Sequence, residues 1–326
     1  MRPFEPLFRN RHVLTIAANF WPRNYADVFE PRARLFQTEE DVRILGIVQE
    51  PRQPPQGDVI LVHGLEGSHN SGYMVSMAQT LLRAGFRTTR LNVRSCGGTE
   101  SYCRTLYHAG LTSDLAHVVR TYREESASPI FLIGYSLGGN VVLKFTGEAG
   151  DSLRGVVAGV VGVSTPIDLD ACCRQMMRLE NQVYERRFLK RLKERYSKRA
   201  ADFPELFPVD GLTGVRSVFE FDDLFTARHF EFGSGQNYYE TQSAQRFLDR
   251  IAVPALLIQA KDDPLIPFSV YCHPSIAANT NIQLIATEHG GHVGFISRKP
   301  PRFWADEVVR DWITDRNGTK RTSTAS

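Results

Sequence analysis

The sequence has few cysteines, no long apolar run and little excess charge, and each absence excludes a class of protein. No apolar stretch approaches the roughly 18 residues that a membrane-spanning helix needs. The formal net charge of +3 over 326 residues is too small to predict a nucleic-acid partner. The residues from Met1 to Pro6 carry prolines and charges where a signal peptide would have its apolar region. We therefore expect a cytoplasmic globular protein.

The cysteines form an odd set of five without a C-x-x-C pair: Cys96, Cys103, Cys172, Cys173 and Cys272. This spacing argues against both a disulfide framework and a zinc site. Reduced thiols packed as small hydrophobic side chains are the expected state. The sequence thus predicts no metal site and no cofactor.

One stretch of the chain has the features of a catalytic turn. Four apolar residues, 130–133, predict a buried strand that leads directly into Gly134-Tyr-Ser-Leu-Gly138. A helical apolar pattern follows from Val141. A strand, a tight G-x-S-x-G turn and a helix together are typical of a nucleophile elbow. Ser136 is therefore the candidate nucleophile, although a serine in such a turn can also simply cap the helix.

The order of elements along the chain predicts an α/β fold. Apolar segments expected to be strands alternate with amphipathic helical segments, which is typical of a mostly parallel sheet flanked by helices. Residues 34–50 predict two antiparallel edge strands. We expect an N-terminal arm over residues 1–33, one domain over 34–315 with a helical cap insertion at about 170–235, and a disordered tail over 316–326.

A serine hydroxyl needs a base, and two histidines are candidates. His292 lies in a glycine-rich loop directly after a predicted strand, and His289 precedes it by three residues. A carboxylate should orient the base, and Asp262 and Asp263 both follow the strand that ends at residue 260. Their position in the sequence does not separate these two acids. The chain order Ser, Asp, His is the order expected for this elbow.

The oxyanion of the reaction requires backbone donors. One should be the N–H group after the nucleophile, at Leu137, and the other should come from the loop after the 59–62 strand. Leu65, which follows His63 and Gly64, is the predicted second donor. We expect His63 itself to be a structural hydrogen-bonding residue beneath this loop.

With these residues in place, the sequence resembles the α/β-hydrolase superfamily, and within it the YheT-like branch, which is related to mammalian α/β-hydrolase-domain lipases and esterases. The resemblance extends over nearly the whole chain. It rests on segments that include 11–12, 63–68, 92–97, 107–110, 134–140, 221–224, 260–264 and 288–295.

The resemblance implies a triad of Ser136, Asp263 and His292 and the hydrolysis of carboxylic esters. The acid of the superfamily usually lies four residues before a loop proline, and Pro267 therefore favours Asp263 over Asp262. The implied substrate is a small-molecule ester, such as an acylglycerol or another lipid ester. A thioesterase or acyltransferase with the same triad is the alternative, as is a ligand-binding protein that has kept the fold without catalysis.

The expected cap contains a strongly basic segment. Residues 186–199 hold eight basic residues and one acid, and their apolar members fall on one helical face. A helix that buries this face and keeps its charges in water is one interpretation. Peripheral contact with anionic lipid is the other. Apolar side chains of the cap could also form an acyl pocket: Met176, Met177, Tyr184 and Phe188. The sequence leaves the oligomeric state open.

Overall fold

The structure is a computed structural model that describes residues 3–23 and 29–323. Residues 1–2, 24–28 and 324–326, which are parts of the expected arm and tail, lie outside the described residues. Within the described ranges, every helix is too short or too polar to cross a membrane.

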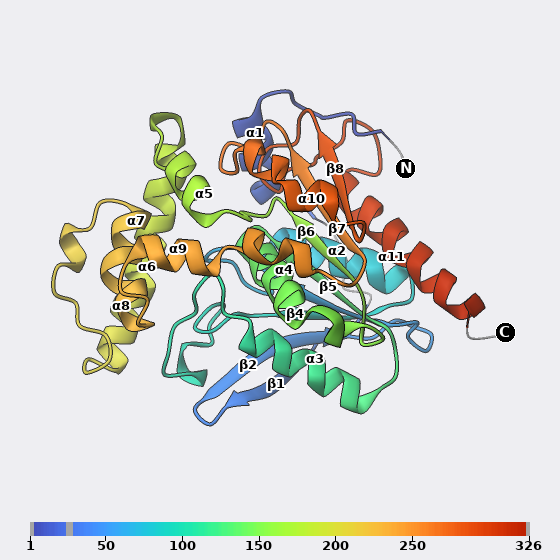
Figure 1. Cartoon of the computed structure of the whole chain (residues 1–326), viewed down its shortest axis with the longest axis horizontal. Coiled ribbons are helices and arrows are strands. Elements are labelled where there is room, and N and C mark those ends of the chain that lie inside the picture. Colours follow the sequence, from blue (N-terminus) through green and yellow to red (C-terminus); the bar gives the residue numbers. More distant parts are fainter. Residues whose placement is uncertain (1–2, 24–28, 324–326) are drawn as a thin grey trace.

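An eight-stranded sheet forms the centre of the molecule, in the order β1-β2-β4-β3-β5-β6-β7-β8 (Figure 1). The strands from β3 to β8 are mutually parallel, whereas β2 runs antiparallel to both β1 and β4. The predicted mostly parallel sheet with an antiparallel edge is therefore confirmed. The strands are β1 (Arg32–Glu39), β2 (Val42–Gln49), β3 (Asp58–Val62), β4 (Arg87–Leu91), β5 (Ile130–Tyr135), β6 (Val157–Val163), β7 (Ala255–Ala260) and β8 (Ile282–Thr287).

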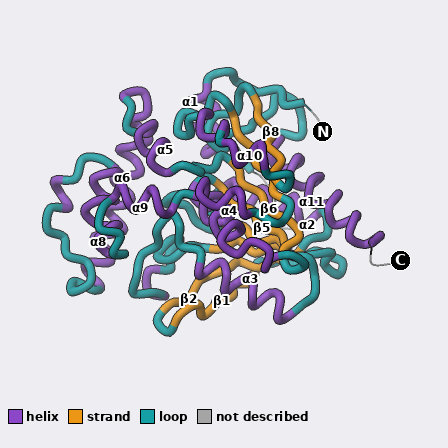
Figure 2. The backbone as a smooth tube through the Cα atoms, viewed as in Figure 1, coloured by secondary structure: helices purple, strands orange, loops and turns teal. Residues whose placement is uncertain are grey.

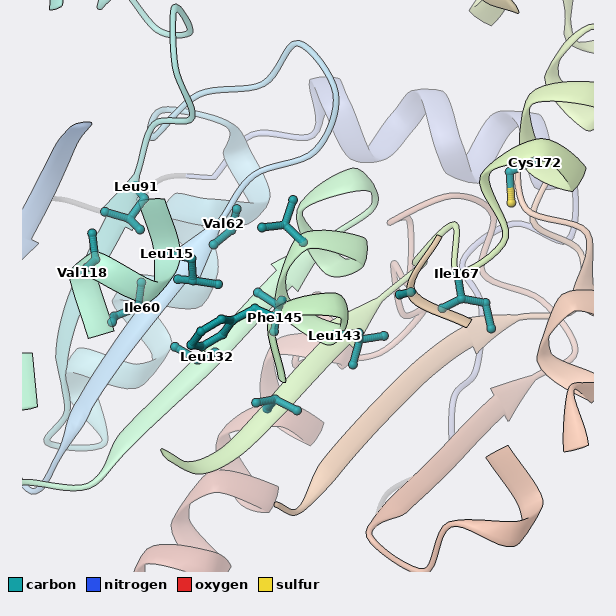
Figure 3. Packing of buried hydrophobic residues seen from close by; sticks show 14 of the residues in the cluster. Ile60, Val62, Leu91, Leu115, Val118, Leu132, Leu143, Phe145, Ile167 and Cys172 are labelled. Atoms are coloured by element: carbon teal, nitrogen blue, oxygen red, sulfur yellow. The ribbon is translucent and has the colours of Figure 1, made fainter. Parts of the chain in front are cut away.

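Helices cover both faces of this sheet (Figure 2). Successive side chains of a strand point to opposite faces, so neighbouring residues of β5 enter different cores. Leu132 packs in the cluster that includes residues of α3 and α4, such as Val118 (Figure 3), and Ile133 packs with residues of α2 and α11. These helices and the short one between β7 and β8 are α2 (Gly72–Arg83), α3 (Ser113–Glu125), α4 (Leu137–Ala149), α10 (Pro274–Ala278) and α11 (Trp304–Ser323).

The segment between β6 and β7 is helical and lies beside the sheet, where Figure 1 shows it in yellow-green to orange. It includes a π-helical turn, η5 (Asp222–Thr226), and a 3₁₀ segment, η6 (Ala244–Arg250), that leads to β7. The helices are α5 (Leu169–Met176), α6 (Gln182–Asp202), α7 (Val218–Phe221), α8 (Ala227–His229) and α9 (Gly235–Gln242). This segment contains the range at which the sequence predicts a cap.

The C-terminal helix is longer than predicted. The domain is expected to end at residue 315, before a disordered tail, but α11 continues to Ser323. Two contacts explain the first part of this extension. The guanidinium group of Arg316 lies 3.9 Å from the ring centroid of Trp312, one helical turn earlier. Asn317 is buried, and its side chain donates to the carbonyl of Gln56. The end of α11 therefore overlaps the range 316–323, where the sequence predicts a disordered tail.

The N-terminal arm contains a helix that the sequence analysis does not predict. Helix α1 (Arg11–Phe20) begins after Asn10, whose side chain accepts hydrogen bonds from the backbone N–H groups of His12 and Val13. Leu14 is fully buried and packs in a small cluster with Ile296, which lies just after the predicted histidine loop. The arm is thus held against the C-terminal part of the domain.

Candidate active site

The turn between β5 and α4 holds Ser136 in a strained conformation. Its φ angle is 51° and its ψ angle is −124°, which is unusual for a residue with a Cβ atom. Two residues before and two residues after Ser136, only glycine fits. A Cβ atom on Gly134 would lie 2.3 Å from the carbonyl oxygen of Gly138, and one on Gly138 would lie 2.4 Å from that of His63. The turn has the strand–turn–helix context that the pentapeptide predicts.

The structure brings Ser136, His292 and Asp263 together above the carboxyl ends of β5, β7 and β8. His292 Nε2 lies 2.9 Å from Ser136 Oγ. His292 Nδ1 lies 2.9 Å from Asp263 Oδ2. An ionised carboxylate can only accept, so its partner Nδ1 carries the proton and Nε2 is left to accept from the serine hydroxyl.

Asp263 is held rigidly. Its side chain is fully buried, and its Oδ1 accepts the backbone N–H groups of Leu265 at 2.8 Å and Ile266 at 3.1 Å. Its Oδ2 accepts from Gln259 Nε2 at 3.2 Å in addition to the imidazole. These hydrogen bonds satisfy a buried charge and aim one oxygen at His292.

The two competing candidates form a separate pair. Asp262 Oδ2 lies 3.1 Å from His289 Nδ1, and Asp262 Oδ1 accepts the backbone N–H of Gly291 at 3.0 Å. The His289 side chain is 37% exposed, compared with 11% for His292. This second pair therefore supports the loop that carries His292, and among the described residues neither side chain of the pair hydrogen-bonds to Ser136.

The N–H groups next to Leu65 are already hydrogen-bonded. The N–H groups of Gly64, Glu66 and Gly67 donate to the Tyr73 hydroxyl, the Tyr107 hydroxyl and the Gly64 carbonyl respectively. Within the part of the chain that the structure describes, the Leu65 N–H has no acceptor.

Leu137 is the first residue of α4, where an N–H group has no acceptor within the helix. Leu65 and Leu137 both line the same cavity as Ser136.

His63 lies beneath this loop and is fully buried. Its Nδ1 donates to the Gly64 carbonyl at 2.8 Å, and its Nε2 accepts from the Val93 N–H at 3.2 Å. Burial lowers the pKa of His63 to about 4, so the ring is neutral at pH 7. His63 is thus a structural residue, as predicted.

Comparisons with known proteins show the family of this chain. The family described as alpha/beta hydrolase fold matches residues 58–299. The chain is also 35% identical over 315 residues to "Putative esterase YheT" of Escherichia coli (strain K12), which covers 94% of this chain and 91% of that protein. The chain belongs to the α/β-hydrolase family. The predicted resemblance to the superfamily and to YheT is confirmed.

One more distant relative and one solved structure add to this comparison. The hydrolase is 25% identical over 261 residues to a monoacylglycerol lipase of Saccharomyces cerevisiae, over 77% of this chain and 57% of that protein. Among solved structures, the Pyrococcus furiosus esterase Pf2001 superposes with a TM-score of 0.59 at 19% identity, over 90% of this chain and 96% of that one. At this identity the likeness shows the shared fold.

Helix α1 contacts the loop that carries His292, which the sequence does not predict. Thr15 Oγ1 accepts the backbone N–H of His292 at 2.9 Å and donates to the Arg11 carbonyl at 2.7 Å. Gly291 has a φ of 61°, and a Cβ atom there would lie 2.6 Å from Thr15 Oγ1. The only sequence signal for this contact is the 11–12 segment of the family resemblance.

A cavity of about 120 Å³ adjoins Ser136 and His292. Of the side chains predicted for an acyl pocket, Met176 and Phe188 line it. The other two do not. Met177 is 42% exposed, and Tyr184 stacks on His12 of α1. Most of the wall is apolar, as a site for an acyl chain requires.

Helix α6 is joined to the loop that carries Leu65. The Arg195 guanidinium forms a buried ion pair with Glu66 and lies 4.5 Å from the ring centroid of Tyr107. Tyr107 Oη in turn accepts the Glu66 N–H. A displacement of α6 would therefore disturb the backbone next to Leu65.

No cluster of three or more histidine, cysteine, aspartate or glutamate side chains is placed to hold a metal ion among residues 3–23 and 29–323. The cavity wall also includes a partly buried acid, Asp222, whose place there the sequence does not predict.

Proposed function

We propose that this protein is a serine hydrolase of carboxylic esters, with Ser136 as nucleophile, His292 as base and Asp263 as the acid that orients the base. The observation that carries this proposal is the unbroken chain of 2.9 Å contacts from Ser136 Oγ through the imidazole to Asp263 Oδ2. The relatives named as esterase and monoacylglycerol lipase support the same reaction class.

The proposed reaction has two steps. Ser136 Oγ bonds to the ester carbonyl carbon while its proton passes to His292 Nε2. The N–H groups of Leu65 and Leu137 stabilise the oxyanion. The carbon–oxygen bond to the alcohol then breaks, and the leaving oxygen takes the proton from His292. A water molecule, deprotonated by His292, attacks the acyl-enzyme and releases the carboxylic acid and the free serine.

The helices between β6 and β7 act in this proposal as a cap that receives the acyl chain. Residues of α5 and α6, such as Met176 and Phe188, line the cavity next to Ser136. Neutral lipid esters, including acylglycerols, fit its largely apolar wall.

Hydrolysis of a p-nitrophenyl ester by wild type and by Ser136→Ala tests the reaction. We expect the substitution to reduce kcat by roughly 10⁴-fold or more. Ser152→Ala is the matched control, since Ser152 is exposed just beyond the end of α4. Equal rates in wild type and Ser136→Ala would refute the proposal and favour a ligand-binding protein without catalysis.

We also propose that the cap makes peripheral contact with anionic lipid. Arg186, Arg187 and Lys190 of α6 are exposed. Close to them, Leu179 is 88% exposed and Val183 is 72% exposed, so apolar and basic side chains share this surface. Such a combination is typical of proteins that bind at a membrane interface.

The same region meets α1, where the exposed fraction of Phe20 is 72%. Arg11 of α1 forms an ion pair with Glu180 at 3.0 Å. The triple substitution of Arg186, Arg187 and Lys190 by glutamine should weaken binding to vesicles that contain phosphatidylserine, whereas Arg154→Gln should not. Unchanged vesicle binding by the triple variant would refute the lipid contact and leave the esterase proposal intact.

A further inference from the structure

A carboxylate faces the otherwise largely apolar cavity. Asp222 begins the π-helical turn η5 and lines the same cavity as Ser136 and His292. Its surface is only partly buried, which is consistent with a side chain that borders a hollow space. An ionised carboxylate in apolar surroundings is costly unless hydrogen-bond donors compensate for its lost hydration. The donors that Asp222 has, and those it lacks, therefore indicate what the cavity can bind.

Two donors of the chain hold Asp222 in place. Tyr239 donates from its hydroxyl to Oδ2 at 2.6 Å, and Thr226 donates from Oγ1 to Oδ1 at 2.7 Å. Both residues also line the cavity. An ionised carboxylate has about four acceptor positions, so two hydrogen bonds leave acceptor capacity on each oxygen. A donor that enters the cavity can use this capacity.

The local backbone separates Asp222 from its neighbour. Asp223 Oδ1 accepts the backbone N–H of Gly235, the first residue of α9, at 2.6 Å. Asp223 does not line the cavity. A π-helical turn is rare and occurs most often at functional sites. Here it gives two adjacent acids different environments, one at the start of α9 and one at the cavity wall.

The chemistry of the cavity favours a neutral donor. Burial raises the pKa of Asp222 to about 6, against the opposing effect of the hydrogen bonds from Tyr239 and Thr226. The group is therefore mainly ionised at pH 7 and lacks part of its hydration. An ammonium group would lose its own hydration on entering this wall of apolar side chains. A hydroxyl group loses much less and still donates one hydrogen bond.

We propose that Asp222, with Tyr239 and Thr226, forms a polar subsite that binds a hydroxyl group of an ester whose carbonyl is attacked by Ser136. This inference rests on the proposed esterase function. The hydroxyl belongs either to a hydroxylated acyl chain or to the alcohol part of the ester, as in a partial glyceride. Both sources present the same donor to the carboxylate.

Two pairs of substrates distinguish these sources. The first pair is p-nitrophenyl hexanoate and p-nitrophenyl 6-hydroxyhexanoate, which differ by a hydroxyl on the acyl chain. The second pair is propyl hexanoate and 1-monohexanoylglycerol, which differ by hydroxyls on the alcohol. The discrimination ratio is kcat/KM of the hydroxylated ester divided by that of the plain ester. We expect wild type to favour the hydroxylated member in one pair.

Three variants test whether the Asp222 carboxylate causes the preference for the hydroxylated ester. In Asp222→Asn the discrimination ratio of that pair should fall by about tenfold or more, as the loss of a charged acceptor predicts. Asp223→Asn should leave the ratio unchanged. Tyr239→Phe keeps the carboxylate but removes one of the donors that hold it, and it should lower the ratio by a smaller factor than Asp222→Asn does. Thermal unfolding of each variant identifies any that fails to fold.

The outcomes separate the two proposals. The subsite is refuted if wild type shows no preference in either pair, or if Asp222→Asn changes both members of a pair by the same factor. Either result leaves the esterase proposal standing, provided that the plain esters are hydrolysed in a Ser136-dependent manner. Failure of wild type to hydrolyse any of the four esters refutes the function on which the subsite depends. A preference for a 6-ammonio ester over the 6-hydroxy ester would overturn the assignment to a hydroxyl.

Discussion

Replacement of each of the two adjacent acids by asparagine tests the assignment of the triad most sharply. Both carboxylate oxygens of Asp263 accept hydrogen bonds. Oδ1 accepts from two backbone N–H groups, and Oδ2 accepts from Gln259 Nε2 and His292 Nδ1. An asparagine there must point its NH₂ group at one of these sets. The backbone donors cannot rotate, so the amide oxygen should take the Oδ1 position and the NH₂ group should face His292.

The imidazole then responds by changing its tautomer. His292 Nδ1 accepts from the new NH₂ group, and the ring proton moves to Nε2, which faces Ser136 Oγ at 2.9 Å. A protonated Nε2 cannot remove the serine proton. The same change in another serine hydrolase lowers kcat by about 10⁴-fold, and we expect Asp263→Asn to have an effect of that order.

Asp262→Asn should behave differently although it alters the neighbouring residue. Its amide oxygen can still accept the Gly291 N–H, and its NH₂ group can donate to His289 Nδ1, which is partly exposed and free to take either tautomer. We expect a loss of less than about tenfold in kcat, since a hydrogen bond is kept at each contact.

Steady-state hydrolysis of a p-nitrophenyl ester by both variants is the assay, with circular dichroism to verify that each folds. A large loss in Asp262→Asn together with a small loss in Asp263→Asn would contradict the tautomer argument. It would transfer the role of the acid to Asp262.

Three further predictions concern the surroundings of the triad. Thr15→Val removes the acceptor of the His292 N–H and should lower kcat roughly 10- to 100-fold. Thr15→Ser keeps a hydroxyl at this position and should retain the activity of wild type. Equal values of kcat in the valine and serine variants would show that the contact is dispensable. Gly138→Ala places a Cβ atom 2.4 Å from the His63 carbonyl and should lower the free energy of unfolding in urea by roughly 2–4 kcal/mol. Gly214→Ala, with open space at its Cβ position, is the control for that experiment. The third concerns pH. Burial lowers the pKa of His63 to about 4 in the folded state, so the unfolded chain binds a proton below pH 6.5 that the native state does not. Stability should fall between pH 6.5 and 4 by up to roughly 3 kcal/mol, and less so in His63→Asn; an identical pH profile in that variant would refute this origin.

The sequence predicts the parts of this protein whose signals are local. The apolar segments at 59–62 and 130–133 become β3 and β5, because a strand buried on both faces needs a continuous apolar run. The elbow is recognisable because Gly134 and Gly138 allow backbone contacts that no other residue permits. Asp263 could be preferred over Asp262 only through the proline spacing of the family, since nothing in the local sequence states which carboxylate points inward.

The features that the sequence does not predict depend on contacts between distant residues. Thr15 and His292 are 277 positions apart, and no periodicity connects them. Asp222 looks like an ordinary first-turn acid until the π-helical turn and Tyr239 place it at the cavity. The polar segment from residue 316 predicts disorder, but α11 continues there, and Asn317 donates to the carbonyl of Gln56, 261 positions away. In each case tertiary context overrides the local pattern.

The support of His292 by α1 has a consequence for how much of the chain makes up the catalytic unit. The family match begins at residue 58, and every proposed catalytic side chain lies within it. The threonine that fixes the backbone of the base lies more than forty positions before that boundary, at residue 15. A protein trimmed to the matched region would retain all three reactive groups and lose the anchor that aligns one of them. The proposed catalytic unit of this hydrolase therefore begins well upstream of the segment by which the family is recognised.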